Sequence, residues 1–204
     1  MGVDRPGPGE ELNTGHATRP RDAATVIVLR GGAEALEVLL VKRNPAQRFM
    51  GGAWVFPGGA VDADEDHRVA GVREVAEEVS VALPDAEALV EFSRWITPAE
   101  ERIRFDTRFY LVSAPEDAAP VPDGNETVDF GWFSPAGALE AYSREEILLV
   151  FPTIKTLEQL APFGSAAELL GWAEGREVVA IEPRVVMEGE VARVVLPGEP
   201  GYEA

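Results

Sequence analysis

Residues 59–81 of the chain read GAVDADEDHRVAGVREVAEEVSV, and this stretch decides the fold. Within it, Glu77 and Glu78 follow Glu74 by three and four residues. On an α-helix this spacing gathers the three carboxylates on one side within a turn and a half. Like charges so placed repel, and each pair costs roughly a few tenths of a kcal/mol in an isolated helix. A hard divalent cation with oxygen ligands would offset the repulsion, so the stretch predicts a metal site.

The same stretch predicts a helix that begins near residues 64–66, where acidic side chains suit a helix N-terminus, and runs to about Val79. A helical wheel places an apolar stripe opposite the three glutamates. We therefore expect one face to pack on a core and the other to present carboxylates. A solvated acidic face without a metal is the alternative. The residues of the stripe are Val69, Val72, Val75, Ala76 and Val79.

Outward from this helix, short apolar segments alternate with turns and further helices. The mixed order of strands and helices predicts an α/β (α+β) sandwich. No internal repeat or long linker divides the 204 residues, so we expect a single domain at 21–204 behind a flexible N-terminal tail at 1–20. Strands are predicted at 23–29, 36–41, 53–56, 89–96, 105–113, 127–133, 178–181, 184–187 and 191–196, a tight turn at 57–59, and helices near 136–142, 153–160 and 165–173.

Charge and cysteine content narrow the function classes. A net charge of −18 argues against a partner that is a nucleic acid polymer, which needs a basic surface. The chain has no cysteine, which excludes disulfides, a thiolate nucleophile and a zinc–thiolate site. No apolar run approaches the ~18 residues that span a bilayer, so we expect no membrane partner and a cytoplasmic location. Exposed strands and terminal segments would permit a homodimer.

The glutamates belong to a longer pattern that includes Gly59, Glu65 and Arg73. The pattern resembles the Nudix box, Gly-x5-Glu-x7-Arg-Glu-U-x-Glu-Glu-x-Gly-U, where U is an apolar residue. Every fixed position matches except Ser80, where the family has Gly. The resemblance implies the Nudix fold, a mixed β-sheet sandwiched between α-helices. A glycine just past a helix end usually supplies a left-handed cap, and another residue there costs about 1 kcal/mol. Ser80 therefore bears on helix termination more than on catalysis.

The resemblance also implies roles for the conserved positions of the box. Glu77 and Glu78 would be ligands of Mg²⁺ or Mn²⁺, and Glu74 would be either a third ligand or the base that activates water. Glu65 and Arg73 resemble the supporting pair of the box, in which the arginine orients a glutamate through a fork-shaped hydrogen bond. An ordinary surface salt bridge is the alternative for that pair.

Two neighbouring positions are assigned by analogy with the same family. The carbonyl of Gly59 is a further candidate metal ligand, whereas Gly58 either allows close approach of the substrate or forms a plain turn. Glu126, just before the strand at 127–133, resembles the distal acidic residue that completes the metal site in many Nudix enzymes. Asp129 competes for that role, and a surface position is the alternative for both.

Residues 39–59 resemble a second signature, that of coenzyme A diphosphatases, which reads Leu-Leu-Thr-x-Arg-Ser-x3-Arg-x3-Gly-x3-Phe-Pro-Gly-Gly. Val41 and Asn44 depart from it, at the Thr and Ser positions. Arg43 and Arg48 are predicted to hold substrate phosphates because a planar guanidinium suits that geometry. Solvent-facing arginines are the alternative. The residues that match are Arg43, Arg48, Gly52 and those at 56–59.

Together these resemblances imply a metal-dependent pyrophosphohydrolase that cleaves a nucleoside diphosphate linked to another group. The favoured substrate is coenzyme A or acyl-CoA, which would give adenosine 3′,5′-bisphosphate and (acyl-)phosphopantetheine. Hydrolysis of ADP-ribose, NADH or a nucleotide is the alternative within the same reaction class. A catalytically silent sensor of nucleotide ligands is the alternative from another class, although the intact set of glutamates argues against it.

Overall fold

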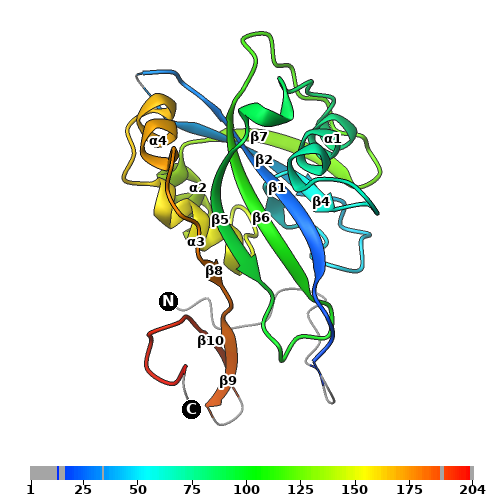
Figure 1. The fold of residues 1–204 in the computed structure, drawn as a ribbon, viewed down its shortest axis with the longest axis vertical. Coiled ribbons are helices and arrows are strands. Elements are labelled where there is room, and N and C mark those ends of the chain that lie inside the picture. The colour runs from blue at the N-terminus through cyan, green and yellow to red at the C-terminus, as the bar shows by residue number, and fades with distance from the viewer. Residues whose placement is uncertain (1–12, 14–16, 34, 189–190, 203–204) are drawn as a thin grey trace.

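The computed structural model describes Asn13 and residues 17–33, 35–188 and 191–202. At its centre is a mixed sheet with the strand order β3-β2-β1-β6-β5-β8, in which β4 also pairs with β1 and β7 with β2 (Figure 1). The long central strand β1 runs parallel to β6 along its whole length. The strands of the sheet are β1 (Arg21–Arg30), β2 (Glu37–Arg43), β3 (Trp54–Val55), β4 (Gly58–Ala60), β5 (Val90–Ile96), β6 (Phe105–Ser113), β7 (Thr127–Phe133) and β8 (Ala180–Ile181).

Helices cover both faces of this sheet (Figure 1). Helix α1 (His67–Val79) packs on one face, and α2 (Pro135–Ser143), α3 (Phe151–Leu160) and α4 (Ala166–Ala173) pack on the other. Because both faces are covered, the middle of β1 is a continuous apolar run whose alternate residues enter different cores. A 3₁₀ turn, η1 (Ala86–Ala88), follows α1, and the hairpin β9 (Arg184–Glu188) and β10 (Val191–Val195) forms a separate sheet. The expected sandwich of helices around a mixed sheet is confirmed.

The tight turn expected at 57–59 is wrong, because Gly58–Ala60 forms strand β4 and pairs antiparallel with β1. Glycine is required at position 58 by this close pairing. A Cβ there would lie 2.3 Å from the carbonyl oxygen of Ala24 and 2.7 Å from the Cα of Thr25. The strand therefore draws the loop before α1 tightly onto the centre of the sheet.

Helix α1 begins and ends close to the predicted residues. Asp66 caps its N-terminus by accepting a hydrogen bond from the N–H of Arg68 at 2.8 Å. Its last turn closes at Ser80, which adopts the left-handed conformation with φ 55° and donates its N–H to the carbonyl of Ala76. Ser80 thus occupies the backbone geometry that glycine favours, and the helix stops there without it.

The predicted apolar stripe of α1 is only partly correct. Val69 and Ala76 are exposed, whereas Glu78, expected on the outer face, is buried. The reason lies outside the helix, because strand β4 and the loop before β7 cover its C-terminal half. Gly71 lies on the buried side instead, where a Cβ would come within 2.8 Å of Val26. Helix and sheet therefore approach closely.

Most of the N-terminal tail expected at 1–20 lies outside the described residues. In the described part of the chain, no helix is both long enough and apolar enough to cross a membrane. The terminal strands expected after residue 178 are present, although β8 joins the main sheet while β9 and β10 pair only with each other.

Candidate active site

The three glutamates of α1 occupy three different environments. Glu78 is only 4% exposed and lies inside the protein. The side chain of Glu74 is 14% exposed, and that of Glu77 is 61% exposed. Glu74 and Glu78 are one turn apart and lie against β4, whereas Glu77 lies on the solvent side and contacts Arg73. The predicted acidic face is therefore a buried pair with one outer neighbour.

Strand β4 receives the two buried carboxylates. The N–H of Gly58 donates a hydrogen bond of 3.1 Å to Oε2 of Glu78. A Cβ at Gly59 would lie within 2.5–2.6 Å of all three atoms of the Glu74 carboxyl group. Glycine at position 59 thus lets the Glu74 carboxylate lie against the backbone of β4, and no larger residue could occupy this position without moving Glu74.

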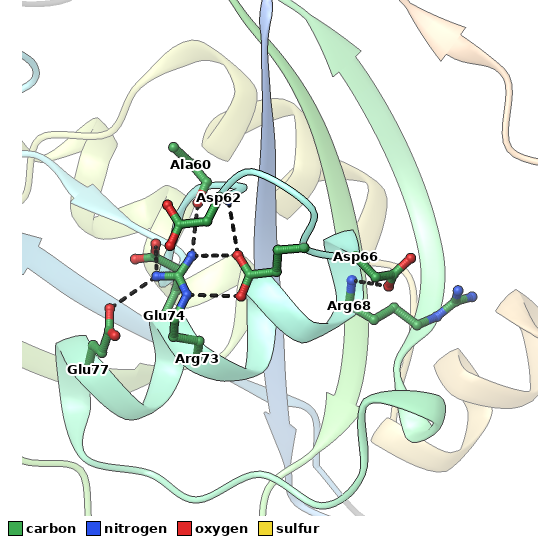
Figure 2. A network of polar contacts seen from close by, with 8 residues as sticks. Ala60, Asp62, Asp66, Arg68, Arg73, Glu74 and Glu77 are labelled. Carbon is green, nitrogen blue, oxygen red and sulfur yellow. Dashed lines mark hydrogen bonds and ion pairs between the residues drawn. The ribbon is translucent and has the colours of Figure 1, made fainter.

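Arg73 connects the loop before α1 to the glutamates (Figure 2). Its Nε and Nη2 donate to the two oxygens of Glu65 at 3.0 and 2.9 Å, which is the fork-shaped pair expected from the sequence. Nη2 also donates to the carbonyl of Ala60 at 3.0 Å. On the other side of the guanidinium, Nη1 donates to Glu74 at 2.7 Å and to Glu77 at 3.1 Å. One arginine therefore orients three carboxylates.

These contacts shift the pKa values of the partners in opposite directions. The hydrogen bond from Arg73 holds the pKa of Glu65 below its ordinary value. The same interactions, with Glu65 contributing most, raise the pKa of Arg73. The Arg73–Glu65 pair is therefore charged at every pH at which the protein would be studied.

A loop far along the chain brings a fourth carboxylate, that of Glu126. The loop is attached to the end of α1, since the N–H of Asp123 donates to the carbonyl of Glu78 at 3.0 Å and the Thr127 hydroxyl donates to the same carbonyl at 2.7 Å. Asp123 in turn accepts hydrogen bonds from the N–H groups of Glu126 and Thr127 at 3.1 and 2.8 Å. Asp129, the competing candidate, is exposed and accepts a hydrogen bond from the N–H of Phe130.

Sequence reasoning missed Asp123 and Thr127. The available signal was the Asp-Gly-Asn segment before an apolar strand, which is typical of a turn held by an aspartate side chain. Nothing in the sequence indicated that this turn would rest on the end of α1.

The buried carboxylates carry electrostatic strain. Burial, with smaller contributions from the negative charges of Glu74 and Glu126, raises the pKa of Glu78 to about 8, against the hydrogen bond from Gly58 and the charge of Arg43. Burial also raises the pKa of Glu74, although Arg73 opposes the change. The charges of Glu74 and Glu126 thus disfavour the ionised form of Glu78, and the charges of Glu77 and Glu126 disfavour that of Glu74.

This donor set is of the kind that a hard divalent cation prefers, because it offers only oxygen atoms. The fit is incomplete as the side chains stand. Among the described residues, no three or more histidine or acidic side chains form a ready-made ligand group. Arg73 donates to one oxygen of Glu74 and one of Glu77, so the second oxygen of either could ligate a cation without loss of that hydrogen bond.

A cavity of about 560 Å³ opens beside these groups. Gly58, Gly59, Glu126 and Arg43 line its polar end, and most of the remaining lining is apolar. The Nε of Arg43 is buried and has no hydrogen-bond partner among the described residues, so a bound anion would satisfy it. Arg48, the other predicted phosphate-binding residue, is exposed and is not among the residues that line the cavity.

The arrangement places buried acids, a cationic side chain and a large apolar cavity next to one another. Perturbed carboxylates in a cleft are typical of catalytic sites. The volume lies within the range of sites for small ligands, roughly 300–1,000 Å³. The geometry therefore suits hydrolysis of a ligand that has an anionic centre and an elongated apolar part.

Comparison with known proteins gives the same picture. The family model described as the NUDIX domain matches residues 19–152. The human protein named acyl-coenzyme A diphosphatase NUDT19 is 33% identical over 124 residues, which cover 58% of this chain and 33% of that protein. A protein from Caenorhabditis elegans named putative nudix hydrolase 7 is 27% identical over 180 residues, which cover 69% of this chain and 60% of that protein. The chain thus spans about a third and about three fifths of the lengths of these relatives.

Among solved structures, a NUDIX hydrolase from Alicyclobacillus acidocaldarius superimposes with a TM-score of 0.67 at 27% sequence identity. The superposition covers 76% of this chain and 96% of that structure. The uncovered part of this chain is therefore additional to the shared fold.

Proposed function

This chain belongs to the Nudix family, and we propose that it is a Nudix hydrolase, a metal-dependent diphosphatase of coenzyme A or acyl-CoA. The observation that carries the proposal is the junction of the Glu74–Glu78–Glu126 group with a large apolar cavity. The name of the human relative supports the same substrate class. The cytoplasmic location and the homodimer stay predictions from the sequence.

The acidic groups would hold Mg²⁺ or Mn²⁺ through Glu74, Glu77 and Glu78, with Glu126 and the carbonyl of Gly59 as further candidates. When bound, the cation would neutralise and align the diphosphate and lower the pKa of an attacking water. Glu74 is a ligand or the general base. Burial raises the pKa of its carboxylate, which makes it a stronger base than an ordinary glutamate.

The remaining residues would position these groups and the substrate. Arg73 and Glu65 fix the loop after β4 and orient Glu74. Arg43 would bind a phosphate oxygen through its unsatisfied Nε, and Arg48 would contact phosphate outside the cavity. Gly58 keeps the floor of the site open to the substrate. Substitution at phosphorus would then release adenosine 3′,5′-bisphosphate and (acyl-)phosphopantetheine.

The apolar character of the cavity favours a pantetheine chain over a second ribose. Pantetheine is an elongated chain whose gem-dimethyl and methylene groups, between two amides and one hydroxyl, would remove apolar wall from water. The nicotinamide riboside of NADH and the terminal ribose of ADP-ribose carry several hydroxyl groups, which would lose hydrogen bonds against such walls. CoA is therefore the first choice over ADP-ribose and NADH.

A substrate panel tests the proposal. CoA, acetyl-CoA, ADP-ribose, NADH and nucleoside triphosphates are incubated with Mg²⁺ or Mn²⁺, with an EDTA control, and products are identified by mass spectrometry. We expect adenosine 3′,5′-bisphosphate from the CoA compounds only with metal. Turnover of ADP-ribose while CoA stays intact would make the alternative reaction correct. No metal-stimulated hydrolysis of any compound would favour the ligand sensor.

Substituting Glu78→Gln tests the metal site within this panel. Glutamine can still accept the hydrogen bond from Gly58 but carries no charge, so the fold is expected to persist. Turnover should fall by more than about 100-fold. Residues that only support metal ligands reduce activity by up to about that factor, and the loss of a ligand should exceed it. Glu140→Gln is the matched control, since the Glu140 side chain is 67% exposed on α2 and, within the described part of the chain, pairs with Arg144 alone. If the Glu78→Gln variant turned over substrate at the wild-type rate, Glu78 would not be a ligand in the proposed metal site.

A further inference from the structure

The end of the cavity away from the glutamates is formed by two segments that are distant in sequence. Pro98 and Ile103 come from the loop between β5 and β6, and Pro183 and Val194 come from the C-terminal hairpin region. Figure 1 shows that hairpin extending beyond the end of the main sheet. The hairpin also lies after residue 152, the last residue matched by the family model. The shared fold alone therefore does not form this end.

Polar contacts clamp the hairpin region onto the loop. Arg104, which is only 8% exposed, donates to Glu182 at 2.6 Å and to the carbonyl of Thr97 at 3.0 Å. The N–H of Val185 donates to Glu100 at 3.2 Å. Further along, the Tyr202 hydroxyl donates to the carbonyl of Glu182 at 2.9 Å. These hydrogen bonds hold the two segments together, so the segments form a fixed wall of the cavity.

This wall is mainly apolar where it faces the cavity, since Pro98, Ile103, Pro183 and Val194 line it. Ile103 is 44% exposed although it lines the cavity, which leaves apolar surface that a ligand could cover. Two charged residues also line this end. The guanidinium of Arg21 stacks on Phe105 at 4.8 Å, and Glu101 is buried.

Strand pairing gives the distance between the wall and the part of β4 that lies against the carboxylates. Gly58 pairs with Thr25 on β1, and Phe105 pairs with Arg21 on the same strand. Four residues of strand separate the two pairs, which corresponds to about 13 Å. An extended pantetheine arm that starts from a diphosphate at Gly58 and Gly59 would bring its sulfur to this region. A group attached to the sulfur would then meet the apolar wall.

We propose that the apolar wall formed by the β5–β6 loop and the hairpin β9–β10 binds the acyl chain of an acyl-CoA thioester and makes this chain prefer acylated over free CoA. The inference rests on the proposed function, and it adds the location and the cause of the acyl preference. Hydrophobic burial of the chain supplies the preference, since each methylene covered by the wall adds favourable transfer free energy.

Binding measured without turnover tests the inference separately from catalysis. Calorimetric titrations in EDTA compare CoA with octanoyl-CoA, and the same pair is compared as substrates with Mg²⁺. We expect octanoyl-CoA to bind the wild-type protein about tenfold or more tightly than CoA does. This difference corresponds to a modest share of the free energy that full burial of the octanoyl chain would supply. Val194→Trp fills the space beside the wall, and Ile103→Ser makes the wall more polar. Each variant should therefore reduce the ratio of the affinity for octanoyl-CoA to the affinity for CoA several-fold.

Met187→Trp is the matched control for the tryptophan variant. Met187 lies on the same hairpin, is 57% exposed and does not line the cavity. The Met187→Trp variant should therefore have the same octanoyl-CoA to CoA affinity ratio as the wild-type protein. Because Ile103 lies on the partly exposed loop, Ile103→Ser remains informative if Val194→Trp fails to fold.

The outcomes separate the two proposals. CoA hydrolysis without any acyl preference, or a preference that both wall variants retain, would overturn the acyl site and leave the diphosphatase proposal intact. A wild-type affinity ratio that both variants lower would support the acyl site, even if neither compound were hydrolysed and the diphosphatase proposal failed.

Discussion

At the scale of single residues, two backbone positions decide how the carboxylates are presented. Gly59 has no side chain, and the Glu74 carboxyl group fills the space that a Cβ would need. Ser80 ends the helix in a left-handed conformation that its family counterpart, glycine, adopts without strain. Gly59 agrees with the Nudix box and Ser80 departs from it. Substitutions at both positions should have measurable effects on activity or stability.

Gly59→Ala should separate activity from folding. The added methyl group must displace the Glu74 carboxyl group, and a shift of about 1 Å in a catalytic group can reduce turnover roughly 100-fold. Stability should change little, because Glu74 can rotate toward solvent. The measurements are kcat/KM and thermal unfolding. Gly171→Ala on α4 is the control, since no atom outside its helix lies within 4 Å of the added carbon and activity should be unaffected.

Ser80→Gly should stabilise the protein. Relief of the left-handed strain outweighs the greater entropy that glycine adds to the unfolded chain, for a net gain of about 0.5–1 kcal/mol. Chemical denaturation gives the free energy of unfolding directly. Ser80→Ala keeps the strain and should give no gain. A loss of stability in Ser80→Gly would mean that the serine side chain stabilises the helix end in some other way.

At the scale of elements, the site is an assembly of one helix, one short strand and two loops. Arg73 ties the loop after β4 to α1 through Glu65 and Ala60, while Asp123 and Thr127 tie the loop before β7 to the end of the same helix. Helix α1 therefore carries ligand candidates on its side and anchors a further candidate, Glu126, at its end.

Arg73→Lys tests the first of these connections. Lysine keeps the charge but cannot form the fork to Glu65 and reach Ala60 at once. We expect a loss of roughly 1–2 kcal/mol in the free energy of unfolding, together with lower kcat/KM because Glu74 is no longer oriented. Arg144→Lys is the matched control. Its partner Glu140 is 67% exposed, and an exposed helix pair of this kind contributes little.

At the scale of the whole molecule, the unusual pKa of Glu78 couples the site to global stability. Between the ordinary value of 4.5 and about 8, folded Glu78 holds a proton that the unfolded chain has released. The folded state binds more protons in this window, so stability falls as pH rises. Glu74 acts in the same direction, because its pKa is raised too.

Unfolding in EDTA between pH 6 and 9 should show this dependence. We expect stability to decrease by at most about 1.4 kcal/mol per pH unit from Glu78, and the slope should be smaller in Glu78→Gln. Mg²⁺ or Mn²⁺ should restore stability at the alkaline end by binding only the folded state. An identical slope in wild type and Glu78→Gln would show that Glu78 titrates normally.

Much of the architecture is predictable because it is local. The bounds of α1, most of the strands and the Arg73–Glu65 pair follow from spacings within a few turns of chain, whereas strand β4 depends on its pairing with β1. The family resemblance indicated the correct fold class for the same reason, since it rests on contiguous motifs.

The sequence by itself thus determined which residues are grouped on α1, where the helix begins and ends, and the sandwich of helices around a mixed sheet. Only the tertiary structure decided that Glu78 is buried while Val69 is exposed, and that Glu126 joins the acidic group. It also decided that a C-terminal hairpin walls one end of the cavity. Periodicity encodes the faces of one element, but burial and pKa depend on which distant segments pack against it, and those contacts exist only once the chain has closed on itself.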